Sequence, residues 1–121
     1  MSLARLRALA VAELGPDDGP PGRPSASAEA GVGASPPVRV ALAARAEVGA
    51  LRYGGPLRYG WPWATVGAWQ EVLDAMVYLE ADPGATAREL ALARELAEVL
   101  TGRIVRTPAG TVLAPLEYRG E

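Results

Sequence analysis

Apolar residues recur at helical spacing in two stretches of the chain. In residues 2–14 the leucines fall on one face, and Ser2 stands where a helix N-cap is expected. In residues 86–101 the pattern is stronger, because Thr86 is followed three residues later by Glu89, the arrangement of a capping box. The sequence therefore predicts an N-terminal helix and a second, well-capped helix near the C-terminal third.

The second of these helices supplies most of the predicted core. Gly102 is the residue type that commonly follows a helix C-terminus, so we expect the helix to stop there. Its apolar stripe consists of Leu90, Ala93, Leu96, Ala97 and Leu100. The residues expected to be largely buried are Leu90, Leu96, Leu100, Ile104 and Val112.

Two other stretches have patterns that fit an extended backbone. Residues 38–53 alternate between valine or leucine and smaller or charged side chains, which favours a strand, although the many alanines leave a helix over 41–51 open. Residues 66–80 place apolar side chains on one face whether they form a helix or a strand, and intrinsic propensity favours the helix only modestly. The pattern does not decide between the two.

The C-terminal residues have the pattern of a β-hairpin. Residues 103–107 and 111–114 are rich in β-branched side chains and flank a Pro-Ala-Gly turn at 108–110. Pro115 places the residues after it at a sheet edge. The expected fold class is therefore α+β, with a small antiparallel sheet packed by the N-terminal helix and the helix at 86–101, and completed by the C-terminal hairpin.

Composition divides the chain into three parts. Residues 1–14 form the N-terminal helix, residues 15–37 form a linker or arm, and residues 38–121 form one α+β domain. The linker is dominated by Gly, Pro, Ser and Ala, so it buries too little to offset the entropy of ordering it. We expect no helix or strand longer than one turn in residues 15–36.

The residue inventory argues against catalysis. The chain has no Cys and no His, which removes thiol nucleophiles, thiolate zinc sites and the commonest general base. Gly31-Val32-Gly33 lacks the flanking strand and helix of a dinucleotide-binding loop. The sequence predicts a protein that is not an enzyme, with no cofactor and no metal site.

Charge is unevenly distributed along the chain. Residues 1–64 carry seven Arg against five carboxylates, and residues 65–121 carry five Arg against nine. A nucleic-acid-binding protein would show a basic face, so this distribution argues against nucleic acid as a partner. No apolar run is long enough to cross a bilayer, and residues 1–14 do not read as a signal peptide. We expect a cytoplasmic site of synthesis and no membrane partner.

A near-repeat in the middle of the chain concentrates side chains that are common at protein interfaces. Leu-Arg-Tyr-Gly occurs at 51–54 and again at 57–60, and Trp-Pro-Trp follows at 61–63. Trp, Tyr and Arg are enriched at binding hot spots. Acidic side chains of the helix at 86–101 could pair with the arginines of a neighbouring copy. The predicted interface residues are Arg52, Tyr53, Arg58, Tyr59, Trp61, Trp63, Glu89, Glu95 and Glu98.

From residue 48 to residue 118 the chain resembles the tail-terminator (tail-completion) proteins of long-tailed bacteriophages, a head-to-tail connector family. Residues 50–56, Ala-Leu-Arg-Tyr-Gly-Gly-Pro, are similar to a strand that enters that family's Gly-Gly-Pro turn. Residues 72–82 are similar to the long strand that comes next. Residues 85–102, with Ala-Arg-Glu-Leu-Ala and a Leu-Thr-Gly ending, are similar to the helix that crosses the sheet.

This resemblance implies a structural protein of the virion, made and assembled in the host cytoplasm. It implies a homo-oligomeric ring, expected to be a hexamer, that caps the tail tube and contacts the head-completion proteins. No chemistry of its own is implied.

A winged-helix DNA-binding regulator is the alternative. Residues 81–91 are similar to the entry into the second helix of such domains, and the terminal hairpin would be the wing. Against it, residues 90–100 contain no break before a recognition helix, and they are acidic. The conformation of residues 66–80 separates the two hypotheses, because a strand favours the tail terminator and a helix favours the regulator.

Overall fold

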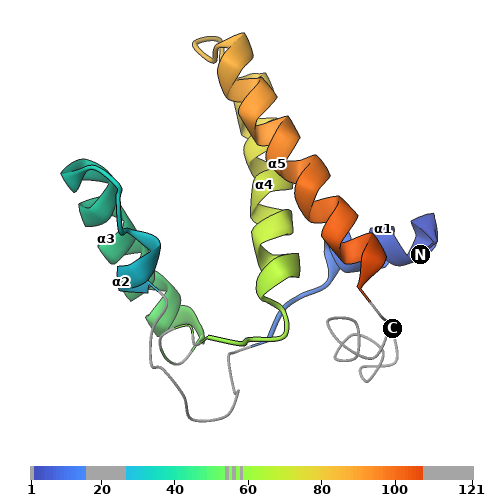
Figure 1. Ribbon diagram of the computed structural model, residues 1–121, viewed down its shortest axis with the longest axis horizontal. Helices are drawn as coiled ribbons and strands as arrows, with labels where there is room; N and C mark the ends of the chain where they lie inside the picture. Colours follow the sequence, from blue (N-terminus) through green and yellow to red (C-terminus); the bar gives the residue numbers. More distant parts are fainter. Residues whose placement is uncertain (1, 16–26, 54, 56, 58, 108–121) are drawn as a thin grey trace. The chain divides into compact units, whose positions relative to one another are not determined.

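A computed structural model describes residues 2–15, 27–53, 55, 57 and 59–107, and every regular element in these residues is helical (Figure 1). The elements are α1 (Leu3–Val11), α2 (Ser27–Ala30), α3 (Pro36–Tyr53), α4 (Ala64–Ala81) and α5 (Ala87–Arg106). The predicted α+β fold with an antiparallel sheet is therefore wrong for the described part of the chain.

The stretch expected to be extended at residues 38–53 forms helix α3. Alanine has the highest helix propensity, and five of the eighteen residues of α3 are alanine. The two prolines at its start occupy the first turn, where a missing N–H and a fixed φ are tolerated. The short-range alternation of valine and alanine predicted a strand, and it is outweighed by this propensity.

The ambiguous stretch at residues 66–80 lies inside helix α4. Val66 and Trp69 are both buried, and their spacing of three residues puts them on one face of a helix. A strand would have pointed these two side chains to opposite faces of a sheet. Burial of this pair selects the helical pattern over the alternating one.

Helix α5 does not stop at Gly102 and continues to Arg106, so the first strand of the predicted hairpin is helical. A glycine inside a helix costs about 1 kcal/mol relative to alanine. That cost is offset by Ile104, which is completely buried, and by Arg103 and Arg106, whose charges suit the C-terminal end of the helix dipole. The second predicted strand lies outside the described residues.

The chain divides into two compact units. The hairpin unit comprises the described residues of Met1–Glu13 and Pro62–Glu121, and the α3 unit comprises those of Leu14–Trp61. The boundaries predicted from composition instead fell after residues 14 and 37. In the described part of the expected linker, α2 is a single turn and α3 begins at Pro36.

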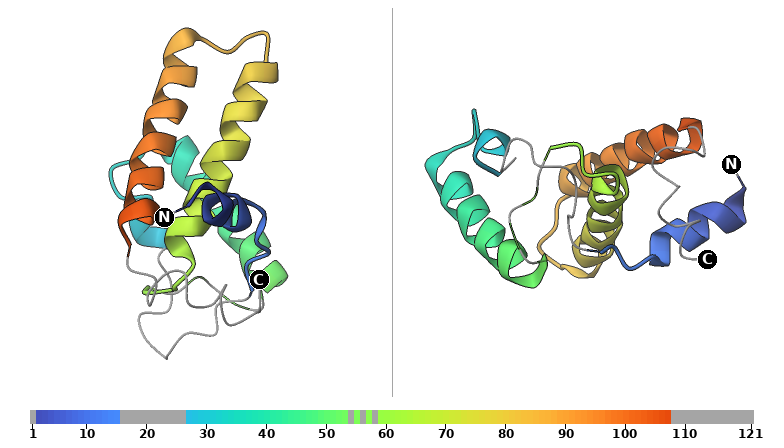
Figure 2. Two further views of the ribbon diagram at one scale, coloured as in Figure 1. Left: turned by 90° about the vertical axis from the view of Figure 1, so that its right-hand side faces the viewer. Right: turned by 90° about the horizontal axis from the view of Figure 1, so that it is seen from below.

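Helices α4 and α5 of the hairpin unit run antiparallel and side by side (Figures 1 and 2). The turn between them is stabilised by the Asp82 carboxylate, which accepts a hydrogen bond from the Gly84 backbone N–H at 2.8 Å. Across the pair, the Trp69 indole N–H donates to the Thr101 hydroxyl at 3.0 Å. The buried apolar residues of the unit are Leu9, Trp63, Val66, Trp69, Ala97, Leu100 and Ile104.

Helix α1 packs against α4 at the end where α4 begins (Figure 2, left). The Gln70 side-chain amide donates to the carbonyls of Leu9 and Ala12 at 2.9 and 3.0 Å, and also reaches that of Ala10 at 3.4 Å. These carbonyls lie at the end of α1 and lack partners within the helix. Leu9 is fully buried, so α1 is held by both apolar and polar contacts.

The α3 unit has a different character. Helix α2 packs against α3, and Gly33 in the turn between them has a φ of 85°, which favours glycine. None of the described apolar side chains of α3 is buried. Val40 and Leu51 are 71% and 88% exposed. The described side chains of this 18-residue helix therefore form no buried core within the unit.

The core prediction is partly confirmed. Leu100 and Ile104 are buried as expected, and Leu90 is half-buried. The prediction is wrong for Leu96, which is 48% exposed. Val112 lies outside the described residues.

Candidate interaction surfaces

The predicted Arg-Tyr-Trp segment crosses the boundary between the two units, so that residues 52–61 belong to the α3 unit and Trp63 to the hairpin unit. Arg52 is exposed in the last turn of α3. Tyr53 ends that helix, and its side chain is not among those described, nor is any part of Arg58. Tyr59 is 41% exposed. The sequence placed these residues together because they are neighbours in the chain, which does not determine where their side chains point.

Tyr59 has a partner that the sequence did not indicate. Its hydroxyl donates a hydrogen bond to the carboxylate of Glu29, which belongs to α2. The two residues are thirty positions apart in the chain. Within the α3 unit this bond ties the segment after α3 back to the helix that precedes it.

The two tryptophans of the Trp-Pro-Trp motif have different environments. Trp61 is half-buried and ends the α3 unit, while Trp63 is 4% exposed and lies in the hairpin unit. Trp63 immediately precedes α4 and belongs to the core with Val66 and Trp69. Trp63 is therefore a packing residue of the hairpin unit, and only part of the predicted segment is open to a partner.

The three predicted acidic residues all lie on α5. Glu89 completes the capping box, since its carboxylate accepts from the Thr86 N–H at 3.1 Å and from the Thr86 hydroxyl at 2.8 Å. Glu95 and Glu98 are exposed. Glu89 thus has a local structural role in addition to its charge.

Helix α5 has a second apolar stripe, which the sequence pattern had merged with the first. Ala97, Leu100 and Ile104 face α4 and are buried. Consecutive helical residues are about 100° apart, so Leu96 points well away from Ala97. The exposed stripe is made of Leu92, Leu96 and Val99, which are 54%, 48% and 55% exposed. Their spacing of four and three residues keeps them on one face.

Helix α4 presents a matching row of uncharged residues. The row has heptad spacing and consists of Thr65, Ala68, Val72, Ala75 and Leu79. Residues two apart in a helix differ by about 200°, so Val72 points nearly opposite to Gln70, which holds α1. Val72 and Leu79 are half-buried. The side of α4 that faces away from α1 is therefore apolar and accessible.

A hydrogen bond shows that the two rows lie on the same side of the hairpin. The Arg103 guanidinium donates to the Thr65 hydroxyl at 3.2 Å. Arg103 continues the exposed stripe of α5, and Thr65 begins the row on α4. We call the combined surface the outer face, made of Val72, Ala75 and Leu79 of α4 with Leu92, Leu96 and Val99 of α5.

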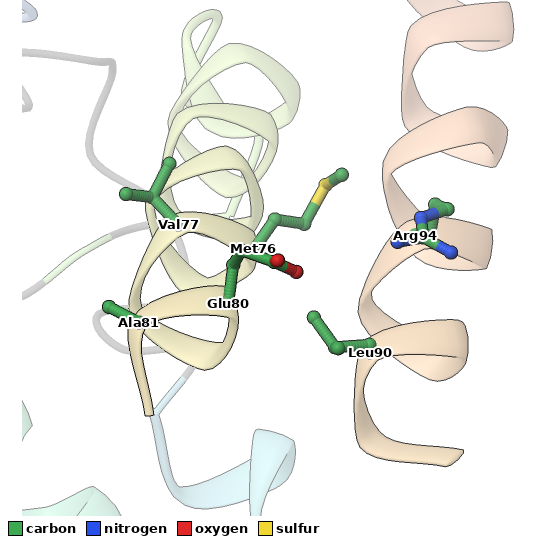
Figure 3. Close-up of a pocket in the computed structure, with 6 residues that line it drawn as sticks. All are labelled: Met76, Val77, Glu80, Ala81, Leu90 and Arg94. Atoms are coloured by element: carbon green, nitrogen blue, oxygen red, sulfur yellow. The ribbon is translucent and has the colours of Figure 1, made fainter. Parts of the chain in front are cut away.

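A groove of about 480 Å³ lies between the two helices near the turn (Figure 3). It is lined by Met76, Val77, Glu80, Ala81, Leu90 and Arg94. Met76 and Leu90 extend toward one another from the two helices, while Val77 points away from α5. The groove is mostly apolar and open, and it carries one acidic and one basic side chain.

Neither a metal site nor a membrane crossing is indicated in the described residues. No group of three carboxylates there is close enough to hold a metal ion. None of the helices in this part of the chain combines the length and hydropathy needed to cross a bilayer.

Comparison with known proteins gives no relative. No protein-family model, curated protein sequence or solved structure matches the chain significantly.

Proposed function

We propose that this protein is a structural subunit that works by associating with copies of itself, without chemistry of its own. The observation that carries the proposal is the outer face of the hairpin unit. Three large apolar side chains of α5, each about half exposed, line up beside an uncharged row on α4. Contiguous apolar surface of this kind on a small protein is typical of interaction sites.

The α3 unit supports the same conclusion. Isolated helices are marginal in water, and most helical stability in proteins comes from packing an apolar face. None of the described apolar side chains of helix α3 is buried, and the helix that packs on it, α2, is a single turn. A subunit with so little internal burial gains stability from association, because binding that favours the folded state shifts the folding equilibrium.

A role in a phage tail remains a prediction. The resemblance to tail terminators implied a strand over residues 72–82, and residues 72–81 are helical. A ring, contacts with the tail tube and head-completion proteins, and a place in the virion all depend on that resemblance. The genes that flank this one test it directly, because a tail terminator is expected among genes for other tail and head-completion proteins.

The geometry supports the winged-helix alternative less well than it supports self-association. A helix of residues 66–80 was the outcome expected for it, and α4 meets that expectation. However, α4 and α5 form an antiparallel pair, whereas the helices of a helix-turn-helix cross at about 90–120°. The expected first strand of the wing is the last turn of α5, and that helix runs without interruption from Ala87 to Arg106.

Sedimentation equilibrium of the full chain tests self-association. We expect the apparent mass to rise with protein concentration from that of one chain to a defined multiple of it. A mass of one chain at all concentrations up to the millimolar range would overturn the proposal. A DNA-binding assay on the same preparation tests the alternative, for which we expect no binding at about 0.15 M salt.

A further inference from the structure

We propose that two copies of the chain pair through their outer faces to form an antiparallel four-helix bundle. The two-fold axis runs perpendicular to the helices, so that α5 lies on α5 of the second copy and α4 lies on α4. This inference rests on the proposed self-association and names the surface, the partner and the register.

The register on α5 follows from where the exposed side chains lie. In an antiparallel pair centred at Leu96, this leucine meets its own counterpart, and Leu92 lies within about one residue of the level of Val99 of the second copy, a difference of about 1.5 Å along the axis. All three side chains of the exposed stripe then find an apolar partner. A two-fold axis requires this kind of reciprocal contact, in which each residue pairs with its symmetric mate.

Helix α4 fits the same axis independently. The bond between Trp69 and Thr101 puts these two residues level with each other, so Leu96 is level with about residues 73–74 of α4. Val72 and Ala75 lie on either side of this level. Val72 therefore meets Ala75 of the second copy, and a large side chain packs on a small one, as close packing requires.

The next layer out repeats this arrangement. Leu79 of one copy lies level with Ala68 of the other, again a large residue over a small one. No position of the α4 row between residues 65 and 79 is charged, so no charge is buried where the two α4 helices meet.

Charges at the ends of α5 also favour the antiparallel pairing. Glu89 lies in its first turn, and Arg103 in its last. Pairing centred at Leu96 puts Glu89 of one copy level with Arg103 of the other, twice by symmetry. The opposed helix dipoles add to this preference. A parallel pairing would instead place like charges together.

The whole side of the hairpin that carries the outer face is large enough for a stable dimer. Helix α5 has 20 residues, which corresponds to a length of about 30 Å at about 1.5 Å per residue. Two helices about 10 Å apart give a face about 20 Å wide, and so roughly 600 Å² on each copy. The sum of about 1,200 Å² reaches the lower end of specific protein interfaces.

Cysteine crosslinking tests the register, because the natural chain has no Cys. In the full-length Leu96→Cys variant the two introduced thiols face each other across the axis. We expect mild oxidation, or a short bismaleimide, to convert most of the protein into a covalent dimer. Val77→Cys is the matched control, since Val77 is 68% exposed on α4 but lines the groove and not the outer face. It should give little crosslinked product.

A second pair of variants tests the surface without crosslinking. Leu96→Glu places two charges at the axis, and we expect it to weaken the dimer at least about tenfold in sedimentation equilibrium. Val77→Glu should leave the dimer unchanged. Circular dichroism of both variants at low concentration checks that the hairpin unit is still helical.

The outcomes separate this inference from the proposed function. If the wild-type chain associates and Leu96→Glu associates equally well, the outer-face dimer is overturned and self-association stands. The same conclusion follows if the wild-type chain associates and Val77→Cys crosslinks better than Leu96→Cys. A wild-type chain that stays monomeric overturns both, and would mean that this face is covered within one chain or by a different protein.

Discussion

Helices α3 and α4 are each 18 residues long, but they have different relations to a core. Helix α4 buries Val66 and Trp69, and it packs along the length of α5. Helix α3 buries none of its described apolar side chains, and the helix packed on it is the short α2. The difference shows that helix propensity can specify an element, while burial requires large side chains at heptad spacing and a second helix to receive them.

Hydrogen exchange on the full chain should show the largest difference between the two helices. Core amides of α4 and α5 exchange only through global unfolding, so we expect protection factors on the order of 10³ or more for them. The amides of α3 in the free monomer should exchange at a rate near that of an isolated helix. Mass spectrometry of peptides from 36–53 and 87–106 measures this. Equal protection of the two ranges in dilute monomer would show that α3 is packed.

Two alanine substitutions on α5 separate its buried stripe from its exposed one. Ile104→Ala removes a fully buried side chain and should lower the free energy of unfolding by about 2–5 kcal/mol. Leu96→Ala should cost less than about 1 kcal/mol in dilute monomer, because the side chain is half exposed. Urea denaturation measures both variants. Equal losses would mean that Leu96 is buried within one chain.

The capping box of α5 should contribute a smaller amount. Thr86→Ala removes the hydroxyl that accepts from the Glu89 N–H at 3.2 Å, and we expect a loss of about 1 kcal/mol. Thr86→Ser retains the hydroxyl and serves as the control. Thermal unfolding followed by circular dichroism distinguishes them, and identical midpoints would contradict the assigned cap.

The smallest effect is expected for a glycine in α3. Ala43→Gly should reduce helical signal locally but leave the main unfolding transition unchanged, because none of the described side chains of α3 belongs to the buried core. Ala91→Gly, at an exposed site of α5, should lower the stability of that transition by about 1 kcal/mol. If Ala43→Gly shifts the main transition, the two units unfold as one cooperative unit.

Local rules predicted the helix at 86–101 because capping is encoded within four residues. Thr86 and Glu89 determine its start wherever the rest of the chain lies. Its end could not be read in the same way. Gly102 favours a stop, and that preference is overruled by the burial of Ile104 against other helices together with the charges of Arg103 and Arg106. Residues 66–80 fit two periodicities, and tertiary contact decides which one forms.

The candidate surface was missed for a related reason. Leu96 and Ala97 are neighbours in the sequence, so both were assigned to one buried stripe, although consecutive residues point about 100° apart. The sequence alone allows two interleaved heptad rows to be distinguished, one through Leu100 and one through Val99. Within the Arg-Tyr-Trp segment, local enrichment in aromatics does not reveal that Trp63 fills a core, and the interface role of the other residues stays a prediction.

The bond from Gln70 to the end of α1 has a consequence for the order of events during synthesis. Helix α1 leaves the ribosome well before α4, and the side chain that satisfies its last carbonyls emerges about 60 residues later. Until then those carbonyls are bound to water, and Leu9 has no interior to enter. This segment is therefore synthesised early and docks late, and until it docks it is accessible to chaperones and proteases near the ribosomal exit.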